Sequence, residues 1–367
     1  MRFAAFAART TKNRSRATPF VRFFSATFFV RWNCFAIPLL RTKNVAYSRN
    51  VIRHLALTIS GNFSNTGDMK HIKRRTIVIL IMLAIGLLYI SLMITANIVF
   101  THTPSSIKYE RDKVRDYNEQ IAFIFDLSNK FVIKEIGTVN STRYPEYKMY
   151  KISYGNKDTK DNKKYLFISG VHGHEPASVY AMKEFIQYLD SIELLDNIAI
   201  DFMYILNPYG FEHNYLYSAS HINIDRDYVR LKSQETKYFL NSVKGEKYIA
   251  VYDFHEDNSN SATGCYMFYY SKNNRKLAVD MLGMLRNNNV PINDEYEFMT
   301  LKAKDGALYV PFFVKLIFMR MGRNAGAGLY FDRIKTKEVF VFETPTKLEM
   351  EKRTEIHLSL LKYIIGI

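Results

Sequence analysis

Alternating apolar runs and helical patterns constrain the fold of this chain more than any other feature. The segments "KYLFISGV" (164–171) and "IAIDFMYILNP" (198–208) are almost continuously apolar, as expected of strands buried on both faces of a parallel sheet. Residues 175–190 lie between them and carry apolar side chains at helical spacing, with Pro176 in the first turn. The local order is therefore strand, helix, strand.

The same alternation continues to the end of the chain. Further strands are expected at 147–155, 247–255 and 338–343, and further helices at 230–243, 274–289 and 347–365. Such alternation favours helices on both faces of a sheet whose strands are largely parallel. We predict one α/β domain over residues 141–367, a three-layer αβα sandwich with a mostly parallel mixed central sheet.

A run of 25 residues without charge, residues 76–100, precedes this domain. Its length and apolarity are typical of a transmembrane helix. Basic residues gather before the run, at 70–75, and mixed charges follow it. The positive-inside bias predicts a cytoplasmic N-terminus, a membrane anchor with its basic flank over residues 69–100, and the bulk of the chain outside the cytoplasm. Residues 101–140 are expected to form a stalk or N-terminal subdomain.

Most of the net charge of +16 belongs to the first 75 residues, which hold 15 Lys and Arg against one acid, Asp68. The remaining 36 bases and 34 acids nearly cancel, which argues against nucleic acid as a partner of the body. Residues 1–68 are expected to be a disordered leader or a mis-extended start, since Met69 opens a basic stretch before the apolar run. Only two cysteines occur, Cys34 and Cys265, so no thiolate metal cluster is expected.

Polar groups follow three of the predicted strands. His172 and Glu175 form an H-x-x-E pair in the turn after residue 171, and His255 ends the strand that begins at 247. Active sites of open α/β sheets lie beyond the carboxyl ends of the strands. Two imidazoles and one carboxylate suit a single Zn²⁺ ion with a fourth position open to water. Glu256 and Asp257, which follow His255, are expected to be solvated loop acids.

Five short motifs occur in the order and setting of the zinc carboxypeptidase superfamily: "GVHGHEPAS", "NPYGFE", "NIDRDY", "DFHED" and "FVFETP". The chain resembles this superfamily over roughly residues 140–350. Both the carboxypeptidase A-like enzymes and the aspartoacylase and succinylglutamate desuccinylase branch belong to it. The resemblance implies that His172, Glu175 and His255 bind zinc.

The resemblance also implies roles for two residues later in the chain. Glu343, at the end of the last predicted strand, matches the general base. Arg226, within "NIDRDY", matches the arginine that binds the terminal carboxylate of the substrate.

The sequence departs from the family pattern in two ways. Asp225 stands where the family has asparagine, which places a negative charge beside the carboxylate site and is expected to favour a less acidic or cationic substrate group. No Arg or Lys lies between Pro208 and Arg226, where the family has an arginine that polarises the scissile carbonyl. Residues that offer a substitute are His213, Asn214 and His221, and candidates for the family's capping tyrosine are Tyr266, Tyr269, Tyr309 and Tyr330.

These observations predict a membrane-anchored, zinc-dependent metallocarboxypeptidase that hydrolyses a C-terminal amide bond of an extracytoplasmic peptide, with cell-wall peptide as one candidate. An N-acyl amino-acid deacylase of the aspartoacylase or succinylglutamate desuccinylase type is the alternative enzyme. Because the polarising arginine is missing and its loss typically slows such reactions by orders of magnitude, a catalytically weak binding relative is the third possibility.

Overall fold

The structure is a computed structural model and describes residues 74–101, 112–140, 145–155, 163–298, 301–322 and 325–367. The chain divides into two units, residues 1–83 and 84–367. The leader predicted for residues 1–68 lies outside the described residues. The second unit contains the predicted hydrolase domain.

Within the described residues, eight strands form one sheet in the order β1-β2-β4-β3-β5-β10-β6-β9. The strands are β1 (Phe131–Val139), β2 (Tyr147–Tyr154), β3 (Lys163–Ile168), β4 (Ile198–Met203), β5 (Ala250–Asp257), β6 (Tyr266–Tyr269), β9 (Ala307–Tyr309) and β10 (Glu338–Pro345). The four central strands β4, β3, β5 and β10 run parallel to one another. β1, β2 and β6 join by antiparallel pairing, and β9 pairs parallel with β6. The predicted mostly parallel mixed sheet is therefore confirmed, and β7 (Glu297–Phe298) and β8 (Leu301–Lys302) form a separate hairpin.

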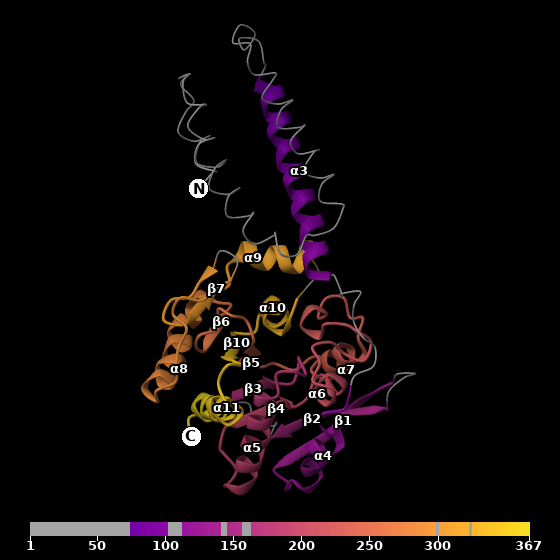
Figure 1. Ribbon diagram of the computed structural model, residues 1–367, viewed down its shortest axis with the longest axis vertical. Coiled ribbons are helices and arrows are strands. Elements are labelled where there is room, and N and C mark those ends of the chain that lie inside the picture. The colour runs from indigo at the N-terminus through magenta and orange to yellow at the C-terminus, as the bar shows by residue number, and fades with distance from the viewer. Residues whose placement is uncertain (1–73, 102–111, 141–144, 156–162, 299–300, 323–324) are drawn as a thin grey trace, which may run out of the picture. The chain divides into compact units, whose positions relative to one another are not determined.

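Helices pack on the sheet as the alternating pattern predicts (Figure 1). After helix α3 (Arg74–Thr101), the described α-helices are α4 (Tyr117–Ala122), α5 (Ala177–Ser191), α6 (Pro208–Glu212), α7 (Gln234–Ser242), α8 (Arg275–Asn287), α9 (Phe312–Leu316), α10 (Ala327–Arg333) and α11 (Met350–Ile365). Short 3₁₀ turns η2 (Phe123–Asp126), η3 (Ile224–Arg226) and η4 (Lys272–Asn274) and a π-helical turn η5 (Ile317–Gly322) complete the regular structure.

Side-chain alternation along the central strands separates a packing face from a site face. Phe254 of β5 and Phe342 of β10 both contact the ring of His357 on α11. Their neighbours His255 and Glu343 point to the opposite face, where they line a cavity. This alternation places chemical groups on one side of strands whose other side is hydrophobic core.

Residues 112–140 contribute to the same sheet. β1 pairs with β2 along its whole length, from Phe131 opposite Tyr154 to Val139 opposite Tyr147. The two strands therefore pair across the boundary predicted between residues 140 and 141. No apolar periodicity marks this segment, because β1 is an edge strand with many half-exposed side chains.

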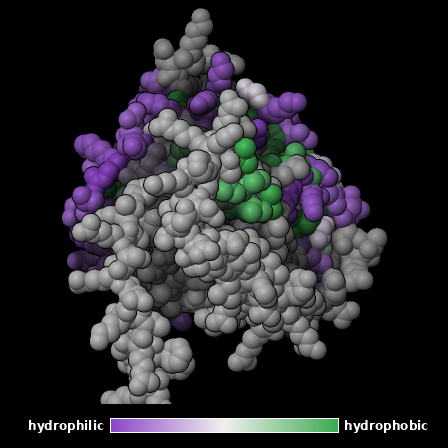
Figure 2. Space-filling model, turned by 90° about the horizontal axis from the view of Figure 1, so that it is seen from above, coloured by the Kyte–Doolittle hydropathy of each residue, from purple (hydrophilic) through white to green (hydrophobic). Residues whose placement is uncertain are grey.

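The charge-free segment before the domain forms α3 (Arg74–Thr101), a helix whose apolar side chains from Val78 to Ile90 are exposed. Within the described residues, no helix is both long and apolar enough to cross a membrane, so the transmembrane helix predicted at 76–100 is not confirmed. Exposed apolar side chains also occur on α9, and Figure 2 shows hydrophobic side chains gathered in one small area of the surface.

Candidate metal centre

The turn between β3 and α5 carries His172 and Glu175 and is tied to the end of β4. Gly170 has a φ of +64°, a backbone conformation that glycine adopts readily, and it reverses the chain just after β3. The carbonyl of Gly170 accepts a hydrogen bond from Asn207 N at 2.9 Å, and the carbonyl of Ser169 accepts one from Leu206 N at 3.2 Å. The turn is thus fixed to the chain segment that follows β4.

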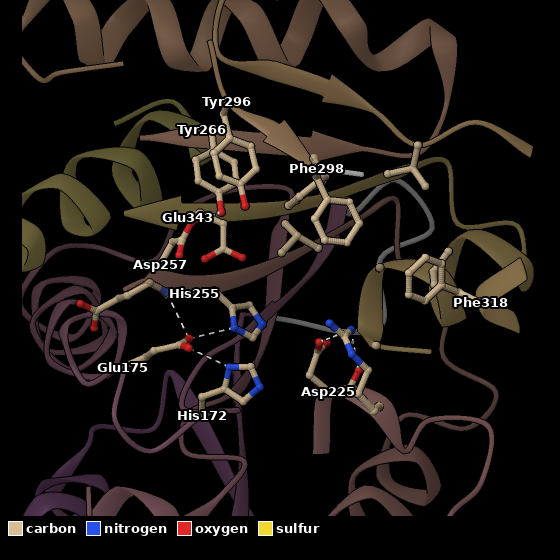
Figure 3. Close-up of a pocket in the computed structure, with 18 of the residues that line it drawn as sticks. His172, Glu175, Asp225, His255, Asp257, Tyr266, Tyr296, Phe298, Phe318 and Glu343 are labelled. Carbon is tan, nitrogen blue, oxygen red and sulfur yellow. Dashed lines mark hydrogen bonds and ion pairs between the residues drawn. The ribbon is translucent and has the colours of Figure 1, made fainter. Parts of the chain in front are cut away.

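Glu175 lies between the two histidines predicted to bind a metal (Figure 3). Its Oε1 is 2.8 Å from Nδ1 of His172, and its Oε2 is 2.9 Å from Nδ1 of His255. All three residues are largely buried, with 13% or less of each side chain exposed. The structure therefore brings together three groups from turns that are about 80 positions apart in sequence.

Each imidazole is also held at its other nitrogen by an oxygen acceptor. Nε2 of His172 lies 3.2 Å from Oδ1 of Asn223, and Nε2 of His255 lies 3.2 Å from Oδ2 of Asp253. When Nε2 of each imidazole carries the proton and donates it to this oxygen, the lone pair of Nδ1 points to the space between the three side chains, where a metal ion could bind. Asn223 and Asp253 were not predicted as site residues, although Asp253 shares a strand face with His255 through its spacing of two.

The donor set fits a divalent ion. One ligand atom from each of His172, Glu175 and His255 lies within 4.8 Å of the others. Two neutral imidazoles and a carboxylate are a ligand set that zinc uses in catalytic sites. Asp225, Asp253 and His255 also bring three donor atoms within 4.8 Å, but Arg226 already engages the carboxylate of Asp225.

The electrostatics of the centre favour positive charge between the two turns. Burial opposes ionisation of Glu175, but the adjacent His172 and His255 outweigh it and lower the pKa of Glu175. Burial also disfavours a charged His255, but Asp253 and Glu175 outweigh that effect and raise its pKa. The carboxylates of Glu175 and Asp253 therefore stabilise positive charge beside His255. A metal ion that replaces the imidazole protons would be stabilised by the same carboxylates.

Glu343 lies on β10 beside His255, its register partner on β5. It is half-buried at the edge of the cavity. Burial raises the pKa of Glu343 well above its usual range, and the nearby carboxylate of Glu175 adds to the increase while His255 opposes it. A carboxyl group with a raised proton affinity next to the candidate ligands is placed to exchange a proton with a reacting water.

The cavity in front of these residues has a volume of about 310 Å³. Its walls are rich in aromatic side chains, namely Tyr266, Phe268, Tyr270, Tyr296, Phe298 and Phe318. Tyr266 stacks on Tyr296 with ring centroids 3.8 Å apart, and its hydroxyl donates to Oδ2 of Asp257 at 2.8 Å. In Figure 3 both phenol rings point toward Glu343. The cavity therefore offers an apolar enclosure with polar groups at one end.

Arg226 and Asp225 also line the cavity, and Asp225 brings a carboxylate oxygen within 4.8 Å of a ring nitrogen of His255. The side chain of Arg226 is 34% exposed, and its Nη1 donates to Oδ2 of Asp225 at 2.5 Å. A Cβ added to Gly326 would lie 1.9 Å from Oδ1 of Asp225, so glycine there leaves room for this carboxylate. The predicted carboxylate-binding arginine is thus partly neutralised by the residue that replaces the family's asparagine.

Several smaller expectations differ from the structure. The proposed substitutes for the missing arginine, His213, Asn214 and His221, do not line the described cavity. Of the four candidate capping tyrosines, Tyr266 lines it, whereas the others do not.

Glu256 was expected to be a solvated loop acid, but it is buried. It accepts a hydrogen bond from Ala177 N at 2.7 Å and forms an ion pair with Arg353. Its carboxylate satisfies the first turn of α5, an interaction between segments 79 residues apart that no local pattern signals.

No family model matches the sequence, and no curated protein is similar to it. Solved structures do share its fold. A "putative metallopeptidase" from Shewanella denitrificans has a TM-score of 0.57 at 15% identity, and the match covers 72% of this chain and 98% of the Shewanella chain. Another from Shewanella baltica has the same TM-score and identity, with coverages of 70% and 98%. A "putative carboxypeptidase A" from Shewanella denitrificans has a TM-score of 0.50 at 16% identity and covers 67% of each chain.

Proposed function

We propose that this chain, whose fold is that of the zinc carboxypeptidase superfamily, is a metal-dependent hydrolase that cleaves a terminal amide bond of a peptide. The observation that carries the proposal is the meeting of the His172, Glu175 and His255 donor atoms within 4.8 Å, in the wall of a cavity that Glu343 also lines. The fold neighbours do not specify a branch of the superfamily.

His172, Glu175 and His255 would hold the ion, with Asn223 and Asp253 orienting the two imidazoles. A zinc ion at this place supplies Lewis acidity, which polarises the scissile carbonyl and lowers the pKa of the attacking water. Glu343 accepts the proton of that water and returns it to the leaving amine. The aromatic walls exclude bulk water, which strengthens the electrostatic interactions within the cavity.

Arg226 would orient the free carboxylate of the terminal residue through its remaining guanidinium donors. The test is a panel of peptides with free or amidated C-termini, assayed together with N-acyl amino acids and with zinc present. Cleavage that depends on a free peptide carboxylate supports a carboxypeptidase. Preference for N-acyl amino acids supports the deacylase alternative, and no cleavage of any substrate by the zinc-loaded protein contradicts both.

The catalytically weak binding relative is favoured by one observation: the segment between Pro208 and Arg226 contains no Arg or Lys. Such a protein would bind zinc and peptide but would show no turnover above that of its Glu343→Gln variant. Comparing the two proteins on the same substrate panel separates binding from hydrolysis.

We also propose that residues 101–367 act outside the cytoplasm, where a cell-wall peptide would be a candidate substrate. The support is the set of basic residues at 70–75, before the apolar segment. Protease accessibility of the C-terminus in intact cells tests this location, and full protection with an intact membrane would contradict it.

A further inference from the structure

Arg115 joins the turn that carries the candidate metal ligands to helix α6 and the residues just after it. Its Nη1 lies 3.2 Å from the carbonyl oxygen of Gly173 and 2.8 Å from that of Phe211. Its Nη2 donates to Oδ1 of Asn214 at 3.0 Å, and its guanidinium carbon lies 5.2 Å from the centre of the Phe211 ring. Gly173 stands between His172 and His174, so one guanidinium contacts the metal-binding turn and its neighbour at once.

The backbone around Arg115 is itself fixed. Val114 N and Arg115 N both donate to the carbonyl of Glu212, at 2.9 and 3.1 Å. The buried side chain of Glu212 accepts hydrogen bonds from Tyr117 N at 3.3 Å and the Tyr147 hydroxyl at 2.6 Å. Residues 112–117, the N-terminal arm, are therefore anchored independently of the contacts that the Arg115 side chain makes.

The metal-binding turn has other contacts besides those to Arg115, among them the two backbone bonds to the segment after β4 and one from Asn207 Nδ2 to the Val171 carbonyl at 3.3 Å. Gly173 N donates to the carbonyl of Tyr215 at 2.9 Å. A Cβ on Gly173 would lie 1.7 Å from the carbonyl carbon of Gly210, so the two backbones pack directly on each other. Gly173 has no side chain of its own to hold it, and its carbonyl takes its side-chain donor from Arg115. A half-buried carbonyl that loses such a charged donor is destabilised.

We propose that Arg115 is a positioning residue for the metal centre. By bridging Gly173 and Phe211, it holds the turn in the form in which His172 and Glu175 meet His255. Lysine cannot replace it, because one ammonium group does not present the planar set of donors that reaches three separate acceptors. This inference rests on the proposed metal site, since it concerns the affinity of that site for zinc.

The experiment measures Zn²⁺ affinity of the full chain by competition with a chromophoric chelator, for wild type and for Arg115→Gln, Arg115→Lys and Arg286→Gln. Arg286 is a matched control, an arginine paired with Asp294 on the exposed side of α8. Both Arg115 variants should bind zinc about tenfold or more weakly, a typical effect of groups that orient metal ligands. The control should equal wild type.

Three results separate the possible failures. If wild type binds no zinc, the proposed function is wrong and the inference falls with it. If wild type binds zinc and both Arg115 variants bind it equally well, only the inference is wrong. If Arg115→Gln does not fold, the zinc affinity of Arg115→Lys tests the inference. If metal-free Arg115→Lys melts at a lower temperature than wild type but binds zinc equally well, Arg115 has a purely structural role. The Co²⁺-loaded proteins provide a second readout, because a displaced turn changes the visible absorption spectrum.

Discussion

Glu343 and His255 are register partners on the adjacent parallel strands β10 and β5. On its other side, Glu343 pairs in register with Tyr266 of the antiparallel strand β6. The candidate base, a candidate metal ligand and a cavity tyrosine thus occupy one row across three strands. Neighbouring strands lie about 5 Å apart, so the sheet itself sets the spacing between these groups.

Replacing Glu343 with Gln should lower kcat by about 10²–10⁴-fold, the usual contribution of a positioned acid–base group. The amide keeps the shape of the side chain but cannot accept the proton of water. Zinc content should be unchanged, because Glu343 is not among the three candidate ligands. The control is Glu338→Gln at the start of the same strand, which should retain full activity. A Glu343→Gln enzyme as active as wild type would exclude Glu343 as the base.

Zinc should stabilise the folded protein, and His255→Ala should remove that stabilisation. A ligand that binds only the folded state at about 100 times its Kd adds about 2.7 kcal/mol. Melting temperatures with zinc and with chelator measure the effect.

His174→Ala is the matched control for His255→Ala, because His174 lies in the turn that carries His172 and Glu175 and lines the cavity but is absent from the His172, Glu175 and His255 donor group. The alanine variant should keep the zinc-dependent increase in melting temperature. Equal loss in the two variants would show that the ligands are assigned wrongly.

Asp225→Asn should shift substrate preference toward free carboxylates. Asp225 now neutralises Arg226 through a 2.5 Å contact, and its negative charge repels an anionic substrate. We expect the ratio of kcat/KM for a free C-terminus over the matched amide to rise about tenfold, which corresponds to about 1.4 kcal/mol. Asp294→Asn, at an exposed ion pair, is the control. An unchanged ratio would mean that Arg226 does not contact the substrate end.

Glu235 should make the protein less stable as pH rises. The side chain is fully buried, and burial raises its pKa from 4.5 to about 7, with Asp227 adding to the increase. The folded state therefore holds a proton that the unfolded state releases between pH 4.5 and 7, so stability falls across this window. Above pH 7 the loss amounts to about 3.5 kcal/mol, at about 1.4 kcal/mol per pKa unit.

The measurement for Glu235 is the free energy of unfolding of wild type and Glu235→Gln from pH 4 to 8. As pH rises from 4 to 8, the free energy of unfolding of wild type should fall relative to that of Glu235→Gln, because glutamine does not titrate. Glu351→Gln on α11, where the side chain is exposed, should run parallel to wild type. A pH-independent difference for Glu235→Gln would contradict the raised pKa.

Gly173→Ala should destabilise the fold and lower zinc affinity together, since its Cβ would lie 1.7 Å from the Gly210 backbone. Gly283 on α8 has nothing within 4 Å of such a Cβ, so Gly283→Ala should be neutral or stabilise by up to about 1 kcal/mol. Denaturant unfolding and zinc titration measure both effects. If Gly173→Ala keeps wild-type stability and zinc affinity, the close packing of the two turns is wrong.

The sequence by itself determined the elements whose side chains follow a clear period. Helix α5 matches the predicted segment 175–190 closely, and strands β3 and β4 begin within one residue of the predicted segments 164–171 and 198–208 but end three and five residues earlier. Burial on two faces or on one helical stripe requires such patterns. Candidate ligands at strand ends also followed from the sequence, since parallel strands deliver their carboxyl ends to one edge. The edge strand β1, which faces solvent on many residues, has no such pattern and was missed.

Only the tertiary structure decided which polar groups meet. Arg115 contacts Gly173 across 58 residues, and Asn223 contacts His172 across 51. A hydrogen bond between distant segments depends on how loops cross, and no local periodicity encodes that crossing. The aromatic walls of the cavity were likewise fixed by packing. Sequence therefore supplied the chemical groups, and the fold selected the partners that orient them.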